Sequence, residues 1–173
     1  MKPEFDRNAQ ITVRPIGPDD WQDYRDFYKG LRDPHHYSGI LSGKNPDDPA
    51  TWQTLFDSTT GTGEFALFGM FDRDQMIGQT SIQFIRNKEE TTALFAGSEM
   101  ADDRRGERLV NKLYQARKEY LEAIGFQGKI VTTIPPGNSG SRAAAERNGF
   151  IDSGRTDEHG YCIYVPEDLG QNI

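Results

Sequence analysis

The sequence predicts an α/β (α+β) fold with a mixed, largely antiparallel central sheet and helices on both of its faces. The first observation behind this prediction is a succession of short apolar runs of strand length in the middle of the chain. The second is a strand–helix–strand–helix pattern in the second half. The third is the presence of 18 glycines and 9 prolines in 173 residues, which indicates short elements joined by many turns.

The N-terminal part of the chain predicts one strand and two helices. Residues 11–15 alternate apolar and polar side chains and end at a proline, which is typical of a short strand. Residues 18–20 supply an N-cap and first-turn acids for a helix. The apolar stripe of that helix consists of Trp21, Tyr24, Tyr28 and Leu31. Residues 33–48 read as a loop rich in proline and glycine, and residues 51–56 indicate a short second helix.

Three strands are predicted next, over residues 64–71, 76–86 and 91–101. The first two are separated by the four polar residues 72–75, a hairpin connection. Another polar turn, residues 87–90, precedes the third strand. The three runs therefore predict an antiparallel meander.

A long amphipathic helix is predicted over residues 105–124, with a polar opposite face and with Gly125 ending it. Its apolar face consists of Leu109, Leu113, Ala116, Tyr120 and Ile124. A buried strand over 129–134 and a small helix over 139–147 follow, and Gly149 caps that helix. The last strands are predicted from Phe150 onward and over residues 160–165.

Composition limits the classes of partner. The 20 basic and 27 acidic residues give a net charge of −7, which disfavours nucleic acid. The acidic balance fits either ordinary solubility or a cationic small-molecule substrate. No apolar run approaches the roughly 20 residues that cross a bilayer, and no signal-like segment opens the chain. The single cysteine excludes an internal disulfide, so the simplest expected compartment is the cytoplasm.

The length of 173 residues predicts one domain over residues 11–166, with tails over residues 1–10 and 167–173.

The junction between the third meander strand and the long helix is the most informative segment for function. The first turn of a helix leaves main-chain N–H groups unpaired, and together with the helix dipole they favour a phosphate or pyrophosphate. Arg104, Arg105 and Arg108 add guanidinium groups, and Gly106 permits a close approach to the main chain. The alternative is a polar helix start with arginines that serve solubility.

This order of elements resembles the GNAT superfamily of acyl-CoA-dependent N-acyltransferases over about residues 11–165. Two motifs carry the resemblance: Arg105-Gly106 before the long helix, and Asn138-x-x-Ser141 followed by Glu146-x-x-Gly149-Phe150. The second motif is similar to the branch that acetylates ribosomal proteins and small amines. The resemblance implies a GNAT-like fold, acetyl-CoA as cosubstrate and no metal.

The resemblance also implies which residues bind CoA. In the family, backbone amides of the segment R/Q-x-x-G-x-G/A hold the pyrophosphate, and the asparagine and serine approach the pantetheine arm and the sulfur. The positions carried over are Met100, Arg105, Gly106, Glu107, Arg108, Leu109, Val110, Asn138 and Ser141. From the residues alone, Asn138 and Ser141 can instead be a helix cap and a small packed residue.

Three positions depart from the family pattern. Arg108 replaces a glycine, Val110 a glycine or alanine, and Ala145 a tyrosine that protonates the leaving thiolate in many members. A helical Arg108 carries no backbone strain, whereas a positive φ there costs about 1–3 kcal/mol.

The expected reaction requires a base, because a primary amine is mostly protonated at neutral pH. Glu99 is the candidate base, with a solvent-facing strand carboxylate as the alternative, and Ser141 is the candidate donor to the sulfur. Main-chain N–H groups near residues 98–101 are candidates for stabilising the oxyanion, through a bulge or divergence of the strand.

The acceptor is expected beside the first helix and the following loop. The candidate substrate-binding residues are Tyr28, His35, His36 and Tyr37. Neither histidine has a carboxylate or cysteine at ligand spacing, so no metal site is predicted.

The sequence thus predicts acetyl transfer from acetyl-CoA to a primary amine of a small molecule or a protein N-terminus. The alternative is a catalytically inactive acyl-CoA-binding or interaction module. No nucleic-acid or membrane partner is expected, and a homodimer is expected only because dimers are common among GNAT proteins.

Overall fold

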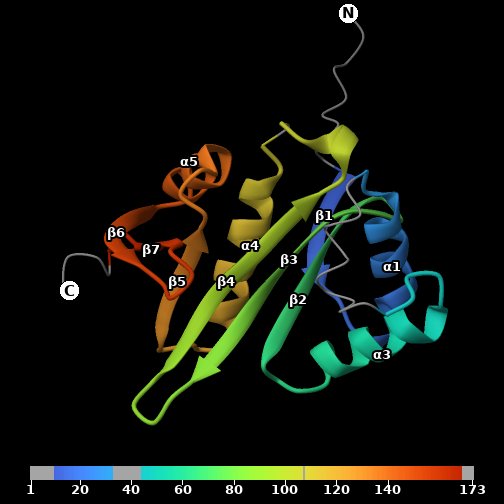
Figure 1. Cartoon of the computed structure of the whole chain (residues 1–173), viewed down its shortest axis with the longest axis horizontal. Helices are drawn as coiled ribbons and strands as arrows, with labels where there is room; N and C mark the ends of the chain where they lie inside the picture. Colours follow the sequence, from blue (N-terminus) through green and yellow to red (C-terminus); the bar gives the residue numbers. More distant parts are fainter. Residues whose placement is uncertain (1–9, 33–43, 107, 169–173) are drawn as a thin grey trace, which may run out of the picture.

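The computed structural model describes residues 10–32, 44–106 and 108–168, so residues 1–9 and 169–173 of the two predicted tails lie outside these ranges. Within these ranges, seven strands form one sheet in the order β1-β2-β3-β4-β5-β7-β6 (Figure 1). The strands are β1 (Ile11–Pro15), β2 (Phe65–Asp72), β3 (Gln75–Arg86), β4 (Thr91–Met100), β5 (Lys129–Ile134), β6 (Phe150–Thr156) and β7 (Cys162–Pro166). Only the β4–β5 pairing is parallel, so the predicted mixed, largely antiparallel sheet is confirmed.

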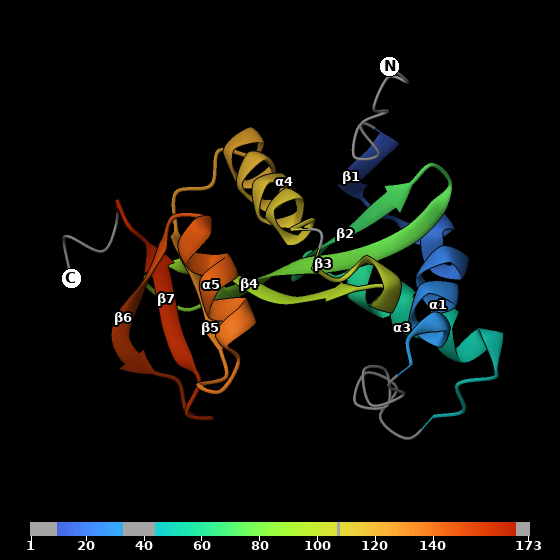
Figure 2. The ribbon, with the colours of Figure 1, turned by 90° about the horizontal axis from the view of Figure 1, so that it is seen from above.

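Helices cover both faces of this sheet. They are α1 (Trp21–Gly30), α3 (Pro49–Thr60), α4 (Val110–Ala123) and α5 (Ser139–Arg147). Because side chains alternate along a strand, Leu67 of β2 packs in the core under α1 and α3, while Phe68 packs under α4. Figure 2 shows α4 on one side of the sheet and α1 and α3 on the other. The predicted arrangement of helices is therefore confirmed.

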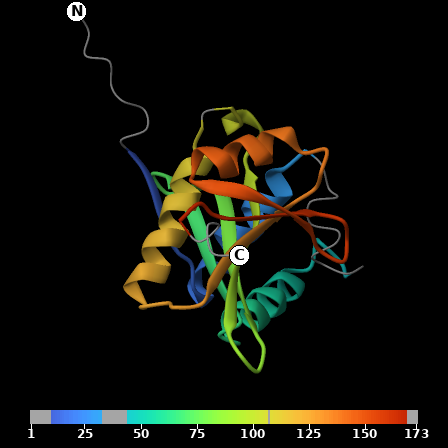
Figure 3. The same cartoon turned by 90° about the vertical axis from the view of Figure 1, so that its left-hand side faces the viewer.

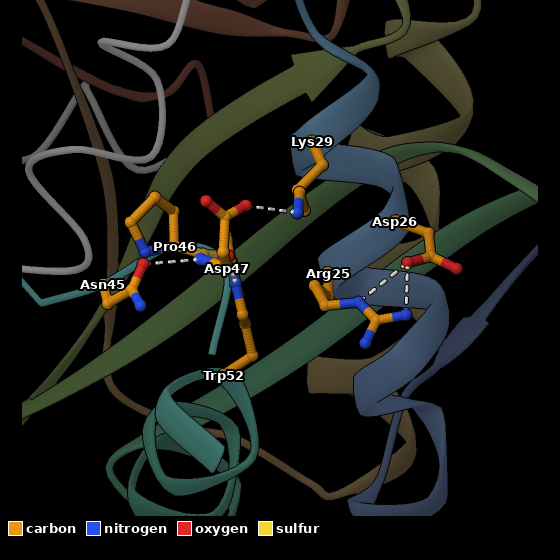
Figure 4. A network of polar contacts seen from close by, with 7 residues as sticks. All are labelled: Arg25, Asp26, Lys29, Asn45, Pro46, Asp47 and Trp52. Carbon is orange, nitrogen blue, oxygen red and sulfur yellow. Dashed lines mark hydrogen bonds and ion pairs between the residues drawn. The ribbon is translucent and has the colours of Figure 1, made fainter. Parts of the chain in front are cut away.

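Helices α1 and α3 cover the same face of the sheet and contact each other through aromatic side chains. Polar contacts tie both helices to the loop that precedes α3. The indole N–H of Trp52 in α3 donates to the carbonyl of Pro46 at 2.8 Å, and the ammonium of Lys29 in α1 lies 2.9 Å from the carboxylate of Asp47 (Figure 4). α3 is longer than predicted, because Pro49 occupies its first turn and Asp48 accepts a hydrogen bond from the N–H of Ala50.

The β2–β3 hairpin is tighter than the sequence predicts. The four-residue connection is wrong: Asp72 pairs with Gln75, and only Arg73 and Asp74 connect the strands. Arg73 adopts a φ of 56°, which allows the shorter turn.

The predicted start of the long helix at Arg105 is also wrong. β4 ends at Met100, a 3₁₀ turn (Asp102–Arg104) follows, and α4 begins at Val110. Gly106 (φ 85°) and Arg108 (φ 57°) lie in the left-handed region, which interrupts a helix. The helix end is as predicted, with Gly125 at φ 65°.

β4 is irregular where it leaves the sheet. It pairs with β5 only over residues 92–95 and continues alone on that side to Met100. Its register with β3 shifts between Ala96 and Ser98, so that Gly97 is an extra residue, a β-bulge. The view along the sheet in Figure 3 shows α4 and α3 on opposite sides of these strands. The divergence of β4 from β5 opens the α4–α5 side to a ligand.

Candidate functional site

Two adjoining cavities lie where β4 and β5 diverge. One, of about 400 Å³, lies between the two strands, and the other, of about 540 Å³, lies at the start of α4. Their shared wall consists of Ser98, Glu99, Val110, Asn138, Ser141 and Ala144. Because they share this wall, we treat them as one feature, the β4–β5 cleft.

Most of the residues predicted to bind CoA line the cavity of about 540 Å³ at the start of α4, which we call the outer part of the β4–β5 cleft. They are Met100, Arg105, Gly106, Arg108, Leu109, Val110, Asn138 and Ser141. Glu107 lies outside the described residues. Two sequence segments some thirty residues apart are thus brought to one cavity.

Four arginines surround this outer part, and they are not equivalent. Arg104 forms an ion pair with Asp72 at 2.6 Å, which holds it against the sheet. The Arg105 side chain is 50% exposed and lies 3.4 Å from Asp102. Arg108 and Arg147 are exposed. Arg147 was missed from the sequence, because it ends α5 and only the packing of α5 beside α4 places it on the cleft wall.

The main chain before α4 has the character of an anion site. A Cβ added at Gly106 would meet nothing within 4 Å, so the loop there is open to a ligand. The N-cap of α4 is Leu109, whose apolar side chain cannot accept hydrogen bonds from the first-turn N–H groups. The N–H groups of Asn111 and Lys112 already donate to the carbonyls of Arg108 and Leu109, at 3.2 and 2.9 Å. The helix dipole and the main-chain N–H groups that precede Asn111 are therefore the features that favour an anion.

Asn138 caps α5, which is the alternative role that the sequence analysis gave it. Its side-chain oxygen accepts a hydrogen bond from the N–H of Ser141 at 3.0 Å. Both residues also line the cleft, so the cap and the position on the wall are compatible. Ala145, where many GNAT members carry a tyrosine, is fully buried in the core.

The bulge in β4 is held from both neighbouring elements. The hydroxyl of the buried Thr80 on β3 donates to the carbonyl of Gly97 at 2.9 Å, and Arg117 of α4 donates to the carbonyl of Ala96 at 3.3 Å. The N–H of Ala101 donates to the carbonyl of Ile77, so it is not available to a ligand. Among the main-chain N–H groups of residues 98–101, the candidate oxyanion donors are therefore those that precede Ala101.

Arg117 is a site-lining residue that sequence reasoning missed. The predicted polar face of the long helix included it, yet it is only 2% exposed and lies between the rings of Phe95 and Tyr114, at 4.3 and 4.5 Å. Burial lowers the pKa of the Arg117 guanidinium to about 10, so it stays charged at neutral pH. Conversely, the predicted apolar-face residue Ile124 is 51% exposed.

A third cavity, of about 420 Å³, lies on the other side of β4, under α1 and α3. We call it the aromatic cavity; its walls include Tyr24, Tyr28 and Phe56. Gly97 and Glu99 line both this cavity and the β4–β5 cleft. Of the predicted substrate-binding residues, Tyr28 lines the aromatic cavity, whereas residues 35–37 lie outside the described part of the chain.

Within the described ranges, no group of three His, Cys, Asp or Glu side chains is placed to hold a metal ion. Among the helices of those ranges, none has the length and apolar character needed to span a membrane.

The β4–β5 cleft combines a strand divergence, a helix start and arginines at its mouth, which are features suited to a phosphate-containing ligand. Residues 10–151 match the family model described as Acetyltransferase (GNAT) domain. The chain therefore belongs to the GNAT acetyltransferase family, which supports acetyl transfer as its reaction class. A search of curated proteins found no match by sequence.

Solved structures show the same fold. The dodecameric spermidine N-acetyltransferase from Vibrio cholerae superposes with a TM-score of 0.67 at 16% identity, covering 96% of this chain and 100% of that one. The ribosomal-protein-S5-alanine acetyltransferase from Vibrio fischeri superposes with a TM-score of 0.65 at 15% identity, covering 90% of this chain and 90% of that one. The PaiA N-acetyltransferase from Thermoplasma acidophilum, solved in complex with coenzyme A, superposes with a TM-score of 0.64 at 14% identity, covering 90% of this chain and 98% of that one. These neighbours confirm the predicted GNAT-like fold.

Proposed function

We propose that the protein transfers an acetyl group from acetyl-CoA to a primary amine of a small molecule or a protein N-terminus. One observation carries this proposal: the β4–β5 cleft and the aromatic cavity lie on opposite sides of β4 and meet at Gly97 and Glu99. A thioester in the cleft and an amine in the cavity would approach each other at that point. Family membership and a neighbour with bound coenzyme A support acetyl-CoA as the donor.

The coenzyme would lie with its pyrophosphate at the start of α4 and its pantetheine arm along the free edge of β4. Arg105, Arg108 and Arg147 supply positive charge at the mouth, and Gly106 leaves room for phosphate oxygens. Asn138 and Ser141 would lie beside the arm. This orientation directs the thioester toward the bulge at Gly97.

Glu99 would accept the ammonium proton of the acceptor, directly or through a water molecule. The neutral nitrogen then attacks the thioester carbonyl carbon, and main-chain N–H groups of β4 stabilise the oxyanion. When the carbon–sulfur bond breaks, the CoA thiolate leaves and takes a proton, for which the Ser141 hydroxyl is the proposed donor. The remaining extra proton of the nitrogen passes, directly or through water, to the Ser141 oxygen, which restores the hydroxyl and yields the acetamide and free CoA. The Glu99 carboxyl then releases its proton to solvent.

The first experiment tests coenzyme binding by calorimetric titration with acetyl-CoA. Arg105→Ala is expected to weaken binding at least about tenfold, because a hydrogen bond to a charged group is worth about 1.5–3 kcal/mol. Arg155→Ala, which removes an exposed arginine of β6, is the matched control and should bind normally. Unchanged affinity in Arg105→Ala would refute the pyrophosphate assignment.

The second experiment separates an enzyme from an inactive acyl-CoA-binding module by following acetyl-CoA consumption with a panel of amines. Glu99→Gln keeps the shape of the side chain and is expected to lower kcat by about 10²–10⁴-fold, with acetyl-CoA affinity retained. Coenzyme binding by the wild-type protein without turnover of any amine would favour the module. An unchanged kcat in Glu99→Gln would place the base elsewhere.

Three further predictions belong to this proposal. We expect a cytoplasmic location, because the chain has a single cysteine, and a homodimer, because dimers are common among GNAT proteins. We also expect that the reaction requires no metal.

A further inference from the structure

The aromatic cavity has the size of a small-ligand site. Its volume of about 420 Å³ is near the lower end of the roughly 300–1,000 Å³ found for ligand pockets. It is bounded by α1, α3 and the sheet, and its inner end reaches Gly97 and Glu99. A molecule held there would present one end to the β4–β5 cleft.

The walls of this cavity are mostly aromatic and aliphatic. The ring of Tyr24 lies 4.9 Å from that of Tyr28 and 5.3 Å from that of Phe56, and Leu55, Phe65 and Leu67 extend the apolar wall. Burial raises the pKa of Tyr24 and the pKa of Tyr28. Both phenols are therefore neutral at physiological pH and supply no negative charge.

Charge is concentrated at one point. Among the described residues of the wall, Glu99 is the only charged one. The polar side chains away from it are partly engaged already; the Thr59 hydroxyl, for example, donates to the carbonyl of Leu55 at 2.8 Å. An ammonium group at Glu99 is matched by a carboxylate. A second ammonium farther from Glu99 would lie among the apolar side chains of the wall, where the described residues offer no counter-ion, and this is costly.

We propose that the acceptor is a monoamine with a compact aromatic or aliphatic body, its amino group at Glu99 and its body against Tyr24, Tyr28 and Leu55. This inference rests on the proposed acetyl transfer and adds its substrate class. It excludes polyamines and extended peptide N-termini as preferred acceptors, because the former carry further charges and the latter further polar main-chain groups that the apolar walls cannot satisfy.

The first test compares acceptors at saturating acetyl-CoA. 2-Phenylethylamine and hexylamine represent the proposed class, and putrescine, spermidine and an alanyl tripeptide represent the others. We expect kcat/KM to be at least about tenfold higher for the two monoamines. Equal or higher kcat/KM for putrescine, spermidine or the tripeptide would overturn the substrate class.

A matched pair of variants tests the reason for the selectivity. Leu55 lies on the wall and is partly exposed, so the chain can accept a polar side chain there. Leu55→Glu is expected to raise the ratio of kcat/KM for putrescine to that for 2-phenylethylamine by about tenfold, and Leu55→Gln should not raise it. Thermal melting checks that both variants are folded. A ratio unchanged in Leu55→Glu, or raised equally in Leu55→Gln, would contradict the charge argument.

Failure of this inference is distinguishable from failure of the proposed function. If the wild-type protein binds acetyl-CoA and acetylates spermidine or the peptide better than the monoamines, only the substrate class is wrong. If acetyl-CoA produces neither heat on titration nor a shift in melting, and no amine is acetylated, both proposals fail together.

Discussion

Arg108 shows how a single backbone conformation bears on the coenzyme site. Its φ of 57° places the Cβ close to the following carbonyl oxygen, a conformation that costs about 1–2 kcal/mol for residues other than glycine. In return, an exposed guanidinium lies on the wall of the β4–β5 cleft, where many GNAT proteins have glycine. We infer that phosphate binding compensates for the strain.

A comparison of two substitutions isolates this strain. Arg108→Gly and Arg108→Ala both remove the guanidinium, but only glycine adopts a positive φ without cost. The glycine variant is expected to be about 1 kcal/mol more stable than the alanine variant in urea denaturation. Both should bind acetyl-CoA more weakly than the wild type. Equal stabilities would mean that residue 108 is not left-handed in solution.

At the scale of the element, β4 determines the site because it is an imperfect strand. The bulge at Gly97 and the loss of pairing with β5 free one edge of the strand, and Thr80 holds the carbonyl of the extra residue. A glycine inside a strand is a recognisable signal for such a bulge. The oxyanion donors that we expected over residues 98–101 depend on this irregularity.

Thr80→Val tests whether the bulge is held in this way. The valine has nearly the same shape but lacks the hydroxyl that donates to the carbonyl of Gly97, so the expected loss of stability is about 0.5–1.5 kcal/mol, the net contribution of an ordinary hydrogen bond. We also expect kcat to fall while acetyl-CoA affinity changes little. Thr80→Ser keeps the hydroxyl and serves as the control. If the valine variant matched the wild type in both measurements, the hydrogen bond from Thr80 would have no part in shaping β4.

At the scale of the whole molecule, the sheet separates two half-sites. Helices α4 and α5 line the proposed coenzyme side with β4 and β5, while α1 and α3 line the proposed acceptor side. In this proposal neither half is a complete site, because the donor and acceptor walls come from opposite faces. Among the residues that the structure describes, only Gly97 and Glu99 of β4 line both.

Ligand addition tests this arrangement in the intact protein. Acetyl-CoA at a hundred times its Kd is expected to stabilise the fold by about 2.7 kcal/mol. For a chain of this size the gain corresponds to a rise in Tm of roughly 5–10 °C. Amide exchange should slow over residues 97–110 and 138–141. Pantetheine, which lacks the pyrophosphate, is the control and should stabilise less; a rise in Tm as large as that with acetyl-CoA would argue against the anion site at α4.

Local patterns were sufficient for much of the fold. The bounds of β1, β5 and α5 were predicted to the residue, since alternation, apolar runs and caps are properties of neighbouring residues. The segment around Arg105 and the pair Asn138 and Ser141 were also selected from local motifs; both line the β4–β5 cleft, and their role in binding CoA stays a prediction. The start of α4 was misplaced, since arginine at position 108 gives no sign of a left-handed backbone.

The sequence by itself determined the order of elements, the family and the two segments that line the β4–β5 cleft. The tertiary structure alone decided the burial of Arg117, the presence of Arg147 on the cleft wall and the position of Glu99 between the cleft and the aromatic cavity. The physical reason is that each depends on contacts between distant parts of the chain. Where β4 leaves β5, and which helices pack on its two faces, is not encoded in any local pattern.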